Sequence, residues 1–143
     1  EIRCDALIGP RDTLRVATIS RSLRGIVGTP DAARFRVCQM GYIELTCEKP
    51  HQSELAHPLV QFTAAELAAN DRKAELAKVD KACQGIVKAY LGEPIAKLSG
   101  YALDPEPPGS TVHPDSRVGR CWISPVGVSK LATGSVRRAG GAG

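Results

Sequence analysis

Residues 63–92, TAAELAANDRKAELAKVDKACQGIVKAYLG, decide the fold because they encode a long amphipathic helix. The stretch opens with a capping box, in which the Thr63 hydroxyl and the Glu66 carboxylate each accept a hydrogen bond from an otherwise unpaired backbone N–H. Apolar side chains then recur at helical spacing, opposite a row of lysines. This apolar stripe comprises Leu76, Val79, Cys83, Ile86, Val87 and Tyr90. Gly92 is typical of a helix C-terminus, and a break near Asn70 would divide the stretch into a short and a long helix.

Strand patterns surround this helix on both sides in the sequence. Alternating or apolar runs predict two N-terminal strands, a second pair joined at Gly41, and a C-terminal pair. Their ranges are 3–8 and 14–19, 34–40 and 42–47, and 117–124 and 129–132. Residues 51–58 are polar and predict irregular structure, and the proline-rich residues 104–110 predict an exposed loop. Helix and strands are segregated along the chain, which favours an α+β fold with a mainly antiparallel sheet packed on one long helix.

The composition fits one domain with a modest core, because the chain has 143 residues of which 43% are hydrophobic. A net charge of +4 is too small, and aromatic residues are too scarce, for a nucleic-acid-binding surface. No apolar run is long enough for a transmembrane helix, and the N-terminus lacks a signal-peptide pattern. We therefore expect any export signal or membrane anchor to lie outside this stretch, and residues 138–143 to be disordered.

Five cysteines indicate the compartment in which the protein works. They are Cys4, Cys38, Cys47, Cys83 and Cys121. Their spacings are wide and irregular and include no C-x-x-C pair, which argues against a zinc finger. Disulfides that staple a small domain are the better interpretation, and they predict an extracytoplasmic location. Two disulfides would leave one cysteine unpaired.

The segment Cys47-Glu48-Lys49-Pro50-His51-Gln52-Ser53-Glu54 gathers the residue types that chemistry uses. One interpretation is a metal site with the ligands Cys47, His51, Glu54 and His57. We expect instead that His51 anchors the turn after Pro50 through backbone hydrogen bonds, so no metal or other cofactor is predicted. A nucleophilic Cys47 assisted by His51 would need a free thiol of low pKa, which disulfide formation would remove.

Other catalytic arrangements have weaker support. Ser53, Ser110 and Ser124 lack the G-x-S-x-G context of a serine hydrolase. Asp104 and Glu106 stand in the proline-rich segment, where we do not expect the fixed geometry that paired carboxylates need. His113 lies in the same flexible-looking region. The sequence therefore predicts no catalytic residue.

The two ends of the chain resemble each other. Arg3-Cys4 and Arg120-Cys121 are each followed by a proline and, at equal distance from the cysteine, by Leu14 and Leu131. This similarity predicts a tandem repeat. Residues 1–25 would then be the tail of a preceding copy, and residues 35–137 one complete copy.

The chain is similar to the actinobacterial septum formation domain in four features: the motif Cys47-x-x-Pro50-His51-x-x-Glu54, the helical Cys83, the segment 117–122 and the late segment Gly134-Ser135-Val136-Arg137. The resemblance covers residues 35–137. It implies a membrane-anchored protein whose domain lies outside the cell, with an association with division and no known enzymatic activity. The chain departs from the family at Cys38, which stands closer to Cys47 than the family's first cysteine stands to its second.

Within this framework we expect two disulfides. Cys83 lies on the buried stripe of the helix and should bridge to Cys47. Cys38, as part of the complete copy, should pair with Cys121 and leave Cys4 unpaired. The alternative is a Cys4–Cys38 bridge that leaves Cys121 free.

Two functions from different classes remain. The first is a non-catalytic extracytoplasmic binding or scaffolding domain at the cell envelope, with an envelope protein or a cell-wall component as its partner. The second is a small envelope enzyme that acts on wall polymers with His51 and Glu54 at its site. A Cys47 locked in a disulfide beside a backbone-bonded His51 would favour the first, and a deep pocket around a free Cys47 the second.

Overall fold

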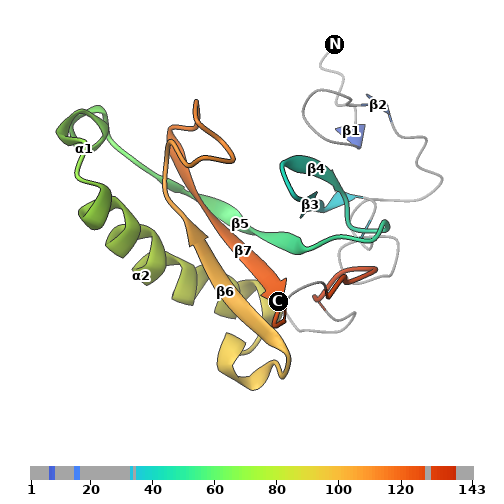
Figure 1. The fold of residues 1–143 in the computed structure, drawn as a ribbon. Coiled ribbons are helices and arrows are strands. Elements are labelled where there is room, and N and C mark those ends of the chain that lie inside the picture. Colours follow the sequence, from blue (N-terminus) through green and yellow to red (C-terminus); the bar gives the residue numbers. More distant parts are fainter. Residues whose placement is uncertain (1–6, 9–14, 17–32, 34, 128–129, 138–143) are drawn as a thin grey trace, which may run out of the picture.

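A five-stranded antiparallel sheet and one long helix dominate the structure, a computed structural model that describes residues 7–8, 15–16, 33, 35–127 and 130–137 (Figure 1). The elements follow the chain in the order β1 (Leu7–Ile8), β2 (Arg15–Val16), β3 (Val37–Met40), β4 (Ile43–Thr46), β5 (Ser53–Gln61), α1 (Ala64–Ala69), α2 (Arg72–Leu91), the 3₁₀ helix η4 (Ile95–Lys97), β6 (Tyr101–Glu106) and β7 (Val118–Pro125). The predicted α+β class is therefore confirmed.

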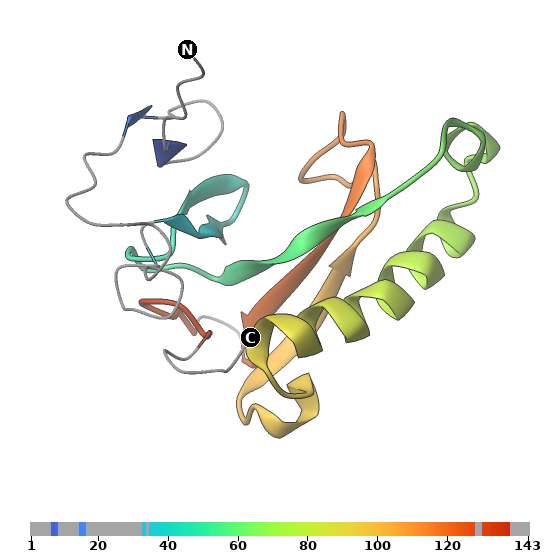
Figure 2. The ribbon, with the colours of Figure 1, turned by 180° about the vertical axis from the view of Figure 1, so that it is seen from behind.

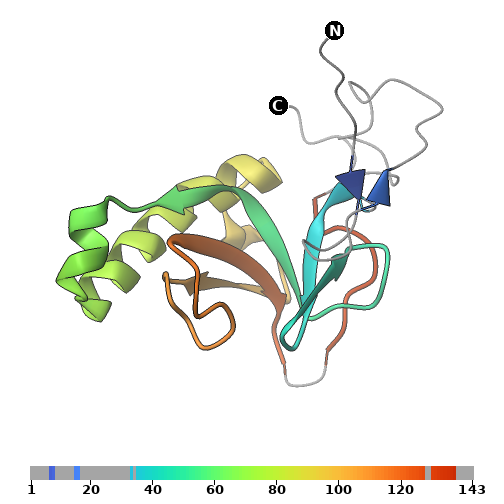
Figure 3. The same cartoon turned by 90° about the horizontal axis from the view of Figure 1, so that it is seen from above.

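The sheet has the strand order β4-β3-β5-β7-β6, and every neighbouring pair is antiparallel. Helix α2 runs diagonally along β5, β7 and β6, and the β3–β4 hairpin lies beside the start of β5, at the end of the sheet away from α1 (Figures 2 and 3). Residues paired across the sheet share a face, so the register divides the side chains into one set facing α2 and another facing away from it. Each set forms one of the two sites described below.

The helices start, break and end where the sequence predicts. Thr63 accepts a hydrogen bond from the Glu66 backbone N–H, and the Glu66 side chain accepts from the Thr63 N–H, so the capping box is complete. Asn70 ends α1 in the left-handed conformation (φ 49°), and Asp71 caps the start of α2. Gly92 ends α2 at φ 80°, a conformation that glycine adopts without steric cost.

The core lies between α2 and the sheet. Val79, Cys83, Val87 and Tyr90 are buried as the apolar stripe predicts. A Cβ atom added at Gly119 of β7 would lie 2.4 Å from Val79 Cγ2, so the missing side chain lets the helix approach the strand. The stripe is wrong at one position: Leu76 is exposed, and Glu75 is buried in its place.

Two segments expected to be irregular are strands. Residues 53–58 belong to β5, whose polar Glu54 is buried and whose register shifts between Ala56 and Val60. Burial of both faces and this bulge hide the alternation that would identify the strand. Residues 104–106 belong to β6, which tolerates Pro105 because an edge strand needs backbone hydrogen bonds on one side only.

The two ends of the chain are described in part. Leu7–Ile8 and Arg15–Val16 pair antiparallel, within the hairpin expected there. The expected strand at 129–132 is absent from its described residues 130–132, where Ala132 makes one isolated bridge to His51. Cys4, residues 138–143 and most of residues 1–25 lie outside the described residues, so the unpaired Cys4, the disordered tail and the division into repeat copies stay predictions.

The four described cysteines form two disulfides, Cys38–Cys47 and Cys83–Cys121. The expected pairs, Cys47–Cys83 and Cys38–Cys121, are wrong, and so is the alternative in which Cys121 is free. The β3–β4 hairpin brings Cys47 back to Cys38, with Cα atoms 5.1 Å apart, and α2 turns Cys83 toward β7. Disulfides are typical of an oxidising, extracytoplasmic or secreted location. Among the helices of the described residues, none has the length and apolar character to cross a membrane.

Candidate functional site

The sequence motif forms a buried group on the face of the sheet that packs against α2. We call Cys38, Cys47, His51 and Glu54 the motif cluster. All four side chains are buried, with exposures of 0% to 1%. Cys47 follows β4, Glu54 is the second residue of β5, and the register Cys38↔Glu54 places both on one face. The motif that suggested a site therefore lies in the interior.

His51 is held by backbone groups, as the sequence predicts. Its backbone N–H donates to the Ala132 carbonyl at 3.0 Å, and the Ala132 N–H donates to the His51 carbonyl at 2.9 Å. Its ring Nδ1 lies 2.7 Å from the Lys49 carbonyl oxygen, which can only accept, so Nδ1 carries the proton. The other ring nitrogen, Nε2, is buried and has no hydrogen-bond partner among the described residues.

Glu54 collects donors from three parts of the chain. Its Oε1 accepts from the Tyr90 hydroxyl and the Ser135 hydroxyl, each at 2.5 Å, and its Oε2 accepts from the Val136 N–H at 2.7 Å. The Arg36 Nη1 atom lies 3.7 Å from Glu54 Oε1. Burial and the charge of Glu54 raise the pKa of Tyr90, so its hydroxyl keeps the proton that it donates.

These contacts make the motif a clamp for the last described segment of the chain, residues 130–137. His51 pairs with Ala132, the Cys47 carbonyl accepts from the Gly134 N–H at 2.8 Å, and Glu54 binds the residues that follow. Arg137 lies over the Tyr90 ring, 5.3 Å from its centroid. His57, considered above as a ligand, is an exposed residue of β5 outside this cluster.

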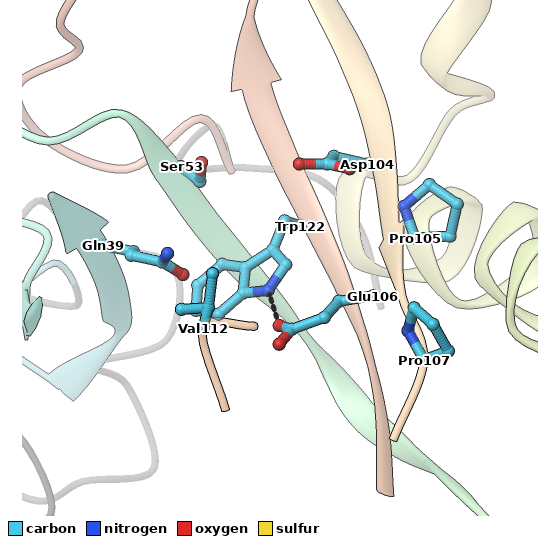
Figure 4. Close-up of a pocket in the computed structure, with 8 residues that line it drawn as sticks. All are labelled: Gln39, Ser53, Asp104, Pro105, Glu106, Pro107, Val112 and Trp122. Atoms are coloured by element: carbon cyan, nitrogen blue, oxygen red, sulfur yellow. Dashed lines mark hydrogen bonds between the residues drawn. The ribbon is translucent and has the colours of Figure 1, made fainter. Parts of the chain in front are cut away.

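A second site lies on the opposite face, where a pocket of about 200 Å³ opens beside β6 and β7 (Figure 4). We call it the Trp122 pocket. Its lining consists of Gln39, Ser53, Asp104, Pro105, Glu106, Pro107, Val112 and Trp122. The register explains the grouping, because Asp104 pairs with Trp122 across β6 and β7, and Gln39 pairs with Ser53 across β3 and β5. Glu106 is on the same face as Asp104, two residues further along β6.

The two carboxyl groups of this pocket differ in environment. Glu106 accepts from Trp122 Nε1 at 2.5 Å, from His113 Nδ1 at 2.7 Å and from the Ser110 hydroxyl. Burial alone would raise the pKa of Glu106, but these hydrogen bonds and the charge of His113 together lower it. Partial burial of its carboxyl group and then the charge of Glu106 raise the pKa of Asp104, whose side chain points toward the Trp122 side of the pocket in Figure 4.

His113 is fixed in place, which corrects the expectation of a flexible loop. Its Nε2 lies 3.3 Å from Glu44, its backbone N–H donates to Ser110, and its ring stacks on Trp122 with centroids 6.2 Å apart. The loop after β6 is therefore tied to the β3–β4 hairpin across the pocket. This order arises from residues distant in sequence, so composition alone does not predict it.

The structure separates the candidate residues into two groups. The motif residues are internal, whereas Ser53, Asp104 and Glu106, for which the sequence offered no geometry, line the pocket. Sequence reasoning missed the pocket because Pro105 concealed the strand that carries both carboxyl groups. The alternation of apolar and polar residues from Leu103 to Glu106 was the signal that could have found it.

Comparison of the chain with protein-family models, with curated proteins and with solved structures finds no match.

Proposed function

We propose that this chain is a non-catalytic binding or scaffolding domain that works outside the cytoplasm. The observation that carries the proposal is the burial of the motif: its cysteine is in a disulfide, its histidine is bonded to backbone and its glutamate accepts from three donors. A nucleophile needs a free thiol and a base that reaches substrate. The motif residues instead hold the fold together.

The cell envelope is the proposed location, with a septum-formation-like protein as the parent molecule. Support comes from the residues of the resemblance, because the motif from Cys47 to Glu54 and the late segment ending at Arg137 meet in one clamp. A domain built around that clamp would need all of these residues together. A role at cell division, and a membrane anchor outside this stretch, belong to the same proposal.

Recognition is assigned to the Trp122 pocket. It offers an apolar surface of Trp122 and Val112, with Gln39 and Asp104 as polar groups (Figure 4). Few polar groups on an apolar surface are typical of sites that orient a bound molecule. The proposed partner is an envelope protein or a cell-wall component.

If the protein is an enzyme, its catalytic residues are in the Trp122 pocket and not in the motif cluster. His51 and Glu54 are buried to 1% and 0% exposure, which argues against contact with a polymer. The carboxyl groups Asp104 and Glu106 would be the better candidates, because their pKa values are shifted in opposite directions. Glu106, however, already accepts from three side chains, which suits an anchor for the loop better than a nucleophile.

A wall-binding assay separates the two functions. Purified protein is incubated with insoluble actinobacterial wall polymer, and both the bound protein and the soluble fragments released are measured. We expect binding without release, and at least about tenfold weaker binding for Gln39→Ala/Asp104→Asn. Lys73→Ala, an exposed change on α2, is the matched control and should bind normally. The same variants are tested by crosslinking to solubilised envelope proteins.

Fragment release that Asp104→Asn or Glu106→Gln abolishes would establish the enzyme instead. Equal binding by the pocket variant and the control, to both wall and envelope proteins, would reject the pocket as the recognition site. His51→Ala should lower the free energy of unfolding by about 1–3 kcal/mol, because the buried hydrogen bond from Nδ1 to the Lys49 carbonyl is lost. A His51→Ala protein of normal stability that loses a wall-degrading activity would contradict the structural role.

A further inference from the structure

We propose that the motif cluster is a binding site for zinc or a similar divalent cation in the chain whose cysteines are reduced. Cys38, Cys47, His51 and Glu54 each offer one ligand atom, and these four atoms all lie within 4.8 Å of one another. The cluster is the one such group that involves cysteine and histidine among the residues described. In the oxidised protein the disulfide occupies both sulfur atoms, so cation binding and the bridge exclude each other.

The distances fit the geometry of a zinc site. Zinc–sulfur bonds of about 2.3 Å and zinc–nitrogen bonds of about 2.0–2.1 Å place tetrahedral ligand atoms roughly 3.3–3.8 Å apart. The four ligand atoms of the cluster are already within 4.8 Å of one another. Breaking the bridge lets Cys38 and Cys47 move apart by side-chain rotation, so the backbone can stay where the hairpin holds it.

An independent observation concerns His51. Its Nε2 is a buried polar atom that has no hydrogen-bond partner among the described residues, and most buried polar atoms in proteins do have one. Because Nδ1 donates to the Lys49 carbonyl, the lone pair is on Nε2. A histidine that binds metal typically donates its other ring N–H to a carbonyl or carboxylate, which is the arrangement seen here.

The donor set selects the cation. Two thiolates and an imidazole suit zinc, and they suit magnesium or calcium poorly. Glu54 is the fourth and weakest ligand, because Tyr90, Ser135 and Val136 already donate to it. These three donors would then orient the ligating carboxylate, as the surroundings of metal-bound carboxylates do.

Reduction and oxidation of Cys38 and Cys47 interconvert the disulfide and the cation site. A dithiol reductant transfers two electrons and two protons to the Cys38–Cys47 bridge and becomes a disulfide itself, leaving two thiols on the protein. The cation then displaces the two thiol protons and binds two thiolates. In the reverse direction a disulfide oxidant accepts two electrons from the two thiolates by thiol–disulfide exchange and takes up two protons to become a dithiol, while the Cys38–Cys47 bond forms and the cation leaves. A newly made chain starts in the reduced state, so the site precedes the bridge.

Cobalt(II) is the probe that tests the site. The full chain is reduced with a phosphine under anaerobic conditions and titrated with cobalt(II), which gives thiolate charge-transfer absorption and intense visible bands in a tetrahedral site. We expect one equivalent to bind to the reduced protein, to be displaced by zinc, and to leave on oxidation. Zinc should also protect Cys38 and Cys47, but not Cys83, from alkylation. The oxidised protein should show no such absorption.

Variants assign the ligands. Cys38→Ala/Cys47→Ala should abolish the absorption, and Cys83→Ala/Cys121→Ala should retain it. His51→Gln should weaken binding at least about tenfold, whereas the exposed His57→Gln should not change it.

Because a variant can lose its fold, circular dichroism is recorded with every titration, and the alkylation pattern of the unmodified sequence decides independently of any variant. Absorption that survives in Cys38→Ala/Cys47→Ala, or that is equal in His51→Gln and the unmodified protein, would overturn the proposal. So would a reduced chain that neither binds cobalt nor gains structure on adding zinc.

Discussion

Glu54→Gln is the substitution that most directly tests the motif clamp. It keeps the size of the side chain but removes its charge and replaces one accepting oxygen with a donating amide group. Whichever way the amide turns, either the Val136 N–H or the Tyr90 and Ser135 hydroxyls then face an NH₂ group. The ion pair of Glu54 with Arg36, at 3.7 Å, is lost as well.

The expected loss in the free energy of unfolding is about 3–5 kcal/mol. Hydrogen bonds to a charged group contribute about 1.5–3 kcal/mol each, and breaking one partner of a buried ion pair costs about 3–5 kcal/mol. These contributions overlap because they share one carboxylate, so they are not added together. Tyr90→Phe removes a single donor and leaves the others in place, so we expect a smaller loss of about 1–2 kcal/mol.

Urea unfolding with the disulfides intact, followed by circular dichroism, measures both losses. Asp80→Asn is the matched control, because it makes the same chemical change on the exposed surface of α2 and should lie within about 0.5 kcal/mol of the unmodified protein. In the double variant, Glu54→Gln and Tyr90→Phe should be clearly less than additive. A Glu54→Gln protein as stable as the control, or full additivity, would refute the clamp.

Three further outcomes follow from the packing, the pocket and the disulfides. Gly119→Ala should lower the free energy of unfolding by about 1–3 kcal/mol, because the added Cβ atom would collide with α2. Gly85→Ala, on the open face of α2, should raise it by up to about 1 kcal/mol, and thermal melts compare the two variants. The interactions that lower the pKa of Glu106 stabilise the fold fully at a pH above its ordinary pKa of 4.5, and this stabilisation is lost as the pH falls through the lowered pKa. Glu106→Gln should therefore flatten the acid side of a curve of stability against pH. An unchanged slope would contradict this. Removal of the Cys83–Cys121 disulfide, which spans 38 positions, should lower the free energy of unfolding by about 4 kcal/mol, and removal of the Cys38–Cys47 disulfide, which spans 9, by about 2.5 kcal/mol. The reverse order in urea unfolding would contradict the loop-entropy argument.

The sequence by itself determined the features whose signals are local. The capping box at Thr63, the break near Asn70 and the end at Gly92 depend on residues that are close in sequence to the backbone groups at the helix ends. The buried stripe of α2 follows helical periodicity, and the prediction failed at Leu76, which is exposed while the neighbouring Glu75 is buried. The α+β class follows from the same local patterns.

Only the tertiary structure decided which distant residues meet. Cys47 pairs with Cys38 because the two face each other across the β3–β4 hairpin, and Cys83 pairs with Cys121 because α2 packs on β7. The spacing of the cysteines in the sequence does not reveal these contacts. Strand β5 and the pocket carboxyl group of Asp104 were missed for a related reason. A strand buried on both faces loses its alternation, and an edge strand accepts a proline, so both depend on their neighbours in the sheet.

The role of the motif shows the same division most clearly. The residue types of Cys47, His51 and Glu54 are compatible with a metal site, a nucleophile or a structural turn, and the sequence favoured the turn. In the oxidised chain the Cys38 bridge occupies the Cys47 sulfur, and residues 135–136, distant in sequence, donate hydrogen bonds to the buried Glu54 carboxylate. The exception is His51 Nε2, and no pattern in the sequence distinguishes that buried lone pair from one that faces solvent.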